Sequence, residues 1–159
     1  MLKKKYDEPT VEAKAYFYEK IETKFGEIKI NLNNKIFFSS GLIGLPMCKN
    51  FCLASNPISS FSRFNILQSL DNKSLSFLVL PLFLDNDIIE KIDLENSARN
   101  LGFALEDLAI ILVASTKIIQ GQKKITVNTR APIFIDIVKK TAVQYVMQNT
   151  QYSISQVYC

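Results

Sequence analysis

The feature that most constrains the fold is a series of short apolar segments, each a few residues long and closely followed by turn-forming residues. In one of them Ile28 and Ile30 alternate with Glu27 and Lys29, which is the pattern of a strand with one buried face. The run 109–114 has no polar residue, as in a short strand buried on both faces. Strands are predicted at 22–30, 35–38, 51–54, 64–70, 75–80, 109–114, 125–127, 133–138 and 142–147.

One segment departs from the strand pattern and is predicted to be a helix. Asp93 is a suitable N-cap, and Gly102 is a suitable stop. Leu94, Ala98 and Leu101 recur with helical spacing and give one short apolar face. Many short strands with one helix predict a mainly β fold, either a small antiparallel β-barrel with one short α-helix or a sandwich. Strands that are apolar on both faces favour the barrel, in which one face fills the interior and the other lies under the helix and loops.

The first 20 residues differ in character from the rest of the chain. They are polar, charged and weakly patterned, so we predict an N-terminal extension over 1–20 and a single β-barrel domain over 21–159. The extension is expected to be an irregular terminus, and the alternative is a short helix over 11–20. No repeat or long linker divides the remainder, whose length suits one domain.

The residue types needed for most enzyme sites are missing. The 159 residues include no histidine, the commonest general base and metal ligand. Cys48 and Cys52 are not followed by a second close pair, and Cys159 is a poor third ligand, whereas a zinc site needs about four ligands. The Gly41-x-x-Gly44 segment lacks the Lys-Ser/Thr of a phosphate-binding loop. We therefore predict no catalytic residue, no metal and no cofactor, and expect a protein that is not an enzyme.

Three cysteines without a secretory signal predict reduced thiols and a cytoplasmic protein. The longest apolar run, 75–84, is shorter than the roughly 18 residues of a spanning helix and contains Pro81. No association with a membrane is expected.

The net charge of +4 leaves a second class of function open. A basic surface with aromatic residues, such as Arg63 followed by Phe64, suits a small basic β-barrel that binds single-stranded RNA. The phenylalanines fall in alternating core patterns, however, which favours packing over base stacking. Direct binding of nucleic acid is therefore the alternative and not the main expectation.

The segment 67–83 carries the most specific pattern in the chain. It reads Leu-Gln-Ser, then a short acidic turn, then an apolar strand that ends near Pro-Leu-Phe, and it resembles the signature hairpin of the flagellar assembly factor FliW family. Further blocks resemble that family in the same order, at 22–28, 38–44, 126–133 and 152–153. The resemblance covers about residues 21–153. The chain departs from the family pattern at Ser39, Ser40, Ile43 and Arg130, and in its basic charge.

The resemblance implies a protein that binds flagellin and the translational repressor CsrA and catalyses no reaction. Free flagellin would occupy the factor, and export of flagellin would release it to capture CsrA, so that flagellin translation resumes. Such a switch needs two competing equilibria and no cofactor. The oligomeric state does not follow from the sequence.

Loop residues inside the resembling blocks are the candidates for contact with a partner. We hypothesise that they are Gly41, Leu42, Gly44, Gln68, Ser69, Asp71 and Asn128. An equally weighted alternative is that the two glycines serve turn geometry and that Gln68 satisfies buried backbone groups. The apolar residues assigned to the core in the same hairpin are Leu67, Phe77, Val79 and Phe83.

Overall fold

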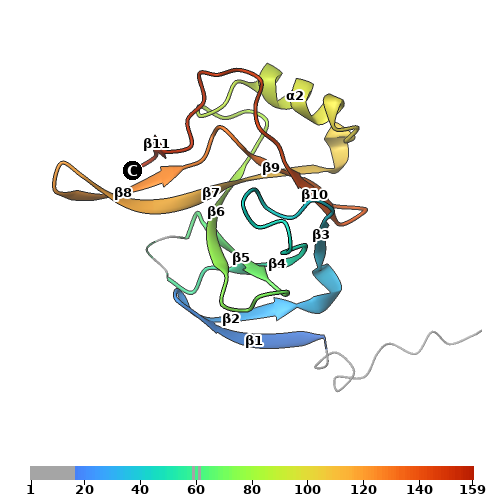
Figure 1. Ribbon diagram of the computed structural model, residues 1–159, viewed down its shortest axis with the longest axis vertical. Helices are drawn as coiled ribbons and strands as arrows, with labels where there is room; N and C mark the ends of the chain where they lie inside the picture. The colour runs from blue at the N-terminus through green and yellow to red at the C-terminus, as the bar shows by residue number, and fades with distance from the viewer. Residues whose placement is uncertain (1–16, 59, 61) are drawn as a thin grey trace, which may run out of the picture.

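The computed structural model describes residues 17–58, 60 and 62–159, and it confirms a mainly β fold with one α-helix in this part of the chain (Figure 1). The strands are β1 (Tyr18–Thr23), β2 (Gly26–Asn31), β3 (Ile36–Phe38), β4 (Asn50–Ser55), β5 (Asn65–Ser69), β6 (Ser76–Leu82), β7 (Leu108–Ile119), β8 (Gln122–Val127), β9 (Ile133–Asp136), β10 (Thr141–Gln144) and β11 (Gln156–Val157). The helix is α2 (Lys91–Asn100), and short 3-10 turns are η1 (Leu32–Asn34) and η3 (Leu105–Asp107).

Strand β7 closes the barrel. It pairs with β6 on one side and with β9 on the other, and the order β7-β6-β5-β4-β3-β10-β9 returns to β7. All these pairs are antiparallel except β3 with β10, where Phe37 lies opposite Thr141 in parallel register. The predicted small barrel is therefore confirmed, with one parallel pair that the sequence pattern did not indicate.

The alternation along the strands builds two apolar clusters. Neighbouring residues such as Leu67 and Ile66 face opposite sides of the barrel wall and are both fully buried. The inner cluster fills the barrel and includes Phe38, Phe51, Leu67, Val79, Ile111 and Ile133. The outer cluster joins the other face of the wall to the β1–β2 hairpin and to α2, and includes Ile28, Ile30, Ile66, Leu94, Ala98, Leu112 and Phe134. Figure 1 shows the hairpin and α2 on opposite sides of the barrel.

The start of the domain differs from the prediction. Residues 18–20 are not part of a helix or an extension, because they form the first half of β1 and pair with β2. Ile21 in this strand is buried in the outer cluster, which explains why the segment is held against the barrel. The rest of the predicted extension, 1–16, lies outside the described residues.

The helix starts earlier than predicted and ends where predicted. Its N-cap is Glu90, which makes no side-chain cap, so the assignment of Asp93 as N-cap is wrong. Asp93 instead accepts hydrogen bonds from the Tyr152 hydroxyl (2.5 Å) and the Asn149 amide (3.2 Å), which tie the C-terminal segment to α2. Gly102 stops the helix with φ of +78°. In the described part of the chain no helix is long and apolar enough to cross a membrane.

Phe83 is the clear error in the predicted core, since 84% of its surface is exposed. Strand β6 ends at Leu82, so the alternation that turns Phe77 and Val79 toward the inner cluster no longer applies at Phe83. The other three residues of that set behave as predicted: Leu67 and Val79 are fully buried in the inner cluster, and Phe77 packs at its edge.

Candidate partner-binding site

The loops that carry the predicted site residues meet at one end of the barrel. Strands β3 and β5 end there and β4 and β6 begin there, as their antiparallel pairing requires. We call residues 39–49, which join β3 to β4, the closing loop, because Leu42 and Cys48 from this loop belong to the inner cluster. The turn 70–75 between β5 and β6 lies beside it.

A carboxylate ties the turn to the closing loop. Asp71 Oδ2 accepts hydrogen bonds from the backbone N–H groups of Lys49 (2.7 Å) and Asn50 (2.8 Å), and Oδ1 accepts one from Asn50 Nδ2 (3.1 Å). The hydrogen bonds from Asn50 and then that from Lys49 favour the ionised form and lower the pKa of the Asp71 carboxyl below its ordinary value. Asp71 therefore fixes the exit of the closing loop, and its side chain remains exposed.

Gln144 ties the other side of the closing loop to the segment that contains Asn128. Gln144 Oε1 accepts a hydrogen bond from Ile43 N (2.9 Å), and Nε2 donates to the carbonyl of Ala131 (3.2 Å). Asn128 is half-buried, and its Oδ1 accepts from Ala131 N (3.0 Å). The structure thus links all the predicted segments at this end of the barrel, but it gives Asn128 a local supporting role.

Gln68 and Ser69 are fully buried and are not available to a partner in this structure. Gln68 Nε2 donates to the carbonyls of Ser69 (2.8 Å) and Lys73 (3.0 Å), and Gln68 Oε1 accepts from the Ser76 hydroxyl (2.5 Å). Ser69 Oγ accepts from Asn72 N (3.0 Å). These hydrogen bonds hold the 70–75 turn in place from its buried side. They support the alternative in which Gln68 satisfies buried backbone groups.

The predicted residues of the closing loop also divide into buried and exposed ones. Gly41 has a φ of +66°, and a side chain there would place its Cβ 2.5 Å from the carbonyl oxygen of Leu45, so turn geometry requires glycine. Leu42 is buried. Gly44 is exposed, and a Cβ added there would meet no atom within 4 Å. Of the seven predicted residues, Gly44 and Asp71 are therefore exposed and Asn128 is half-buried.

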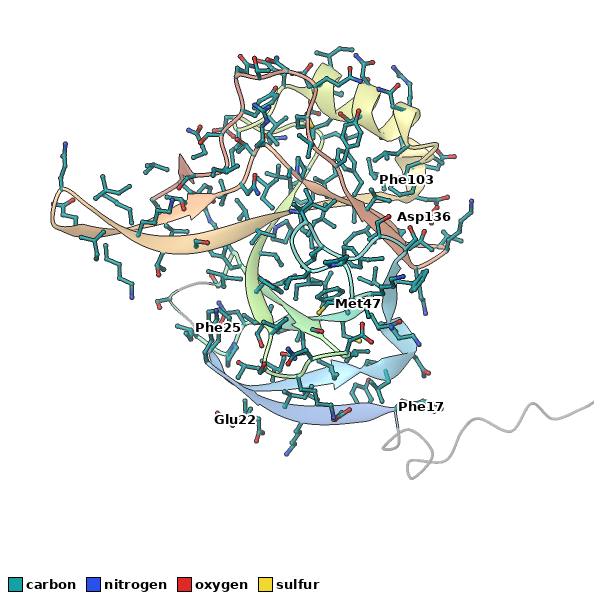
Figure 2. The ribbon with its side chains drawn as sticks, viewed as in Figure 1. Phe17, Glu22, Phe25, Met47, Phe103 and Asp136 are labelled. Atoms are coloured by element: carbon teal, nitrogen blue, oxygen red, sulfur yellow. The ribbon has the colours of Figure 1, made fainter. Side chains whose placement is uncertain are left out.

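Two apolar residues of the closing loop are exposed and are not among the seven predicted site residues. Ile43 is 57% exposed and Met47 is 83% exposed, and Pro46, next to Met47 in the chain, is exposed as well. Figure 2 labels Met47. Their signal in the sequence is an apolar side chain in a loop that contains Gly41, Gly44 and Pro46, where no strand alternation directs it into the core. A flexible thioether beside a branched aliphatic side chain suits an adaptable apolar contact with a protein.

The described residues contain no group of three or more histidines, cysteines or acids that is able to hold a metal ion. Cys48 and Cys52 are both free and buried, in the inner and the outer cluster respectively. Burial raises the pKa of the Cys52 thiol, which lowers its fraction of reactive thiolate at neutral pH.

The aromatic residue that motivated the RNA-binding alternative is not on the surface. Phe64 is 3% exposed and packs edge-on against Tyr158, with 5.7 Å between the ring centroids. Arg63 Nη1 donates to the Tyr158 hydroxyl at 3.3 Å. Phe64 therefore has no free face on which a base can stack.

We predict that Asp71→Asn lowers the free energy of unfolding at neutral pH, because the amide carries no negative charge and accepts the same hydrogen bonds more weakly. The folded-state pKa of Asp71 lies below its unfolded value, so the stabilisation is fully present above the unfolded pKa, about 4, and is lost as the pH falls through the folded value. Urea unfolding of both proteins between pH 7 and the acid limit of folding measures the difference. A gap that stays constant or widens in acid would contradict this role.

Comparison with known proteins shows to which family the chain belongs. The family model for "FliW protein" matches residues 19–157. The proteins named flagellar assembly factor FliW from Clostridium tetani and Bacillus pumilus are 33% and 32% identical to it, over 85% and 83% of this chain and 92% and 90% of theirs. A solved structure, the crystal structure of the flagellar assembly factor FliW, superimposes with a TM-score of 0.62 at 26% identity and covers 87% of this chain and 96% of that one. The chain therefore belongs to the FliW family.

Proposed function

We propose that this protein is a cytoplasmic flagellar assembly factor that binds flagellin and antagonises the translational repressor CsrA, and so couples flagellin synthesis to flagellar assembly. The observation that carries the proposal is the family match over residues 19–157, together with relatives named as flagellar assembly factors. The role requires binding alone, which agrees with a chain that has no histidine.

The closing loop supplies a surface suited to one of these partners. Flagellin subunits expose apolar terminal segments before they assemble, and the apolar side chains of Ile43 and Met47 offer a matching contact. Because Asp71 and Gln144 hold both sides of the loop, its conformation is largely set before binding, which reduces the entropy that binding must offset. We assign flagellin to this surface.

Competition between the partners would then act as the switch. If flagellin and CsrA each bind the factor and exclude one another, free flagellin lowers the amount of factor available to CsrA by mass action. Each partner weakens the other by the same factor, since the coupling free energy is reciprocal. No covalent step is involved.

The test is a titration of the full chain against purified flagellin and purified CsrA, each alone and then in competition, by isothermal calorimetry. We expect binding to each and displacement of one by the other. The double variant Ile43→Ser with Met47→Ser should weaken flagellin binding by about tenfold or more, because it removes the exposed apolar contact. The matched control is Ile92→Ser, which changes an equally exposed isoleucine on α2.

Binding to neither partner would overturn the proposal as a whole. Unchanged flagellin binding by the double variant, with wild-type stability, would overturn the assignment of flagellin to the closing loop. Equal losses in the double variant and in Ile92→Ser would do the same, because they would show a general effect of removing surface apolar area.

A further inference from the structure

Strand β7 has a free edge over its last five residues. Its pairing with β6 runs from Leu82↔Ile110 to Leu78↔Ala114 and then stops. The strand continues to Ile119, and among the described residues 115–119 pair with β8 alone. Ser76 and Phe77 of β6 likewise pair with β5 but not with β7. The two strands therefore separate, and the β7–β8 hairpin projects beyond the barrel (Figure 1).

A groove opens where β6 and β7 separate. It has a volume of about 660 Å³, and its apolar lining residues are Phe25, Ile58, Phe77, Leu78, Val113 and Ala114. Phe25 comes from the β1–β2 turn (Figure 2). None of the residues that line this groove belongs to the closing loop.

The charged residues that line the groove are of one sign. Lys24 and Lys123 line its rim, and no acidic residue lines it. Lys24 Nζ lies 5.1 Å from the centroid of the Phe25 ring, and neither lysine forms an ion pair with a described residue. On the adjoining hairpin Lys117 and Lys124 face each other across the strands, and neither forms an ion pair within the described part of the chain. Like charges placed opposite each other on a sheet destabilise it, so the arrangement favours binding of an anionic group.

We propose that this groove binds an extended segment of a partner protein, which adds as a strand to the free edge of β7. Its backbone would pair with 115–119, and its apolar side chains at alternate positions would enter the groove. The acidic side chains between them lie on the opposite face of the added strand and would face Lys117 and Lys124. Strand addition to an exposed edge is an established mode of peptide recognition, in which backbone bonds give affinity and alternate side chains give specificity.

The same lysines argue against a second copy of this chain as the occupant. Pairing two copies through their β7 edges would bring the basic hairpins of both chains together, and lysine on an edge strand is a common protection against such pairing. An acidic and apolar strand meets no such repulsion. The proposal goes beyond the proposed function and does not depend on which partner the closing loop binds.

The experiment uses the full chain and a fluorescently labelled peptide of sequence Thr-Val-Glu-Val-Asp-Val-Thr, which alternates apolar and acidic residues. Fluorescence anisotropy measures its affinity, and hydrogen exchange measures protection of the amides of 115–119. We expect binding with new protection of these amides. The variant Lys117→Glu with Lys124→Glu should weaken binding about tenfold, which corresponds to roughly 1.4 kcal/mol. The matched control is Lys139→Glu, in the β9–β10 turn, which should bind as the wild type does.

Two control peptides complete the design. The same sequence with lysine in place of both acids should bind more weakly, and a version with proline at the central valine should not protect 115–119, since proline cannot complete a strand ladder. Absence of binding, equal affinity for the acidic and lysine peptides, or equal losses in the double variant and in Lys139→Glu would overturn the proposal. So would protection of 115–119 that rises with protein concentration in the absence of peptide, because it would assign the edge to a second copy.

Discussion

Phe38→Ala is expected to lower the free energy of unfolding by about 3–5 kcal/mol, the usual cost of removing a fully buried phenylalanine. Phe38 has no exposed surface, and its ring meets Phe51 edge-on with 4.9 Å between centroids. Alanine would leave a cavity inside the barrel where the short strand β3 meets β4. Because β3 has only three residues, few other contacts hold it in the wall. Urea unfolding followed by far-ultraviolet circular dichroism measures the change.

The neighbouring residue supplies the matched control. Phe37 lies on the other face of β3 and is 43% exposed, so Phe37→Ala removes the same side chain from a partly solvated position. Its effect should stay below about 1 kcal/mol, as for most surface substitutions. Similar losses in the two variants would show that the inside and outside of β3 have been assigned wrongly, and with them the closure of the barrel.

The expected difference between Phe38→Ala and Phe37→Ala depends on the alternation of buried and exposed residues, which the sequence predicts well. Alternation in segments such as Glu27 to Ile30, and apolar runs such as 109–114, indicate which residues are buried and that some strands are covered on both faces. Two clusters on opposite sides of one wall are the direct consequence. The stop at Gly102 is also predictable, because a left-handed φ favours glycine whatever the surrounding fold.

Other features depend on contacts between distant residues and were not predictable. The parallel pairing of β3 with β10 joins Phe37 to Thr141, and nothing in either local sequence specifies it. Asp93 has the residue type of an N-cap, yet its carboxylate binds Tyr152, 59 residues away in the chain. Phe83 continues an apolar pattern just past the residue where the strand stops. In each case the local sequence does not determine the outcome, because the outcome depends on tertiary structure.

The predicted site residues lie on segments that meet at one end of the barrel, but several of them are buried and support the loops from inside. A polar residue in a turn has the same appearance in a sequence whether it faces solvent or supports the backbone from inside. Gln68 and Ser69 are of the second kind, and Gly41 is fixed by a close approach to Leu45. The sequence does not indicate that the apolar residues Ile43 and Met47 are exposed, because apolar side chains are normally assigned to the core.

The buried amide of Gln68 leads to the second large effect. Gln68→Ala should lower the free energy of unfolding by about 2–4 kcal/mol, because it removes buried side-chain atoms and leaves the Ser69 and Lys73 carbonyls and the Ser76 hydroxyl without their partner. In the intact protein no buried side-chain nitrogen or oxygen among the described residues lacks a partner. The variant would therefore introduce several unsatisfied groups at one point.

A double-mutant cycle separates this hydrogen-bond network from simple loss of volume. Gln68→Ala and Ser76→Ala should be coupled by about 1 kcal/mol, since the Ser76 hydroxyl donates directly to Gln68 Oε1. Asp71→Ala on the same turn is the control, and it should cost about 1 kcal/mol or less because its bonds are exposed to solvent. Additive effects of Gln68→Ala and Ser76→Ala would contradict the network.

The free energy of unfolding of Gln68→Ala also decides how a loss of partner binding in this variant is to be interpreted. If Gln68 acts from inside the turn, any loss of partner binding in Gln68→Ala should follow the fraction of unfolded protein and should disappear when an osmolyte such as trimethylamine oxide restores folding. The loss in the Ile43 and Met47 double variant should persist under the same conditions, because those side chains lie on the surface. A defect in fully folded Gln68→Ala that resists the osmolyte would instead return Gln68 to the partner surface and require the turn to open on binding.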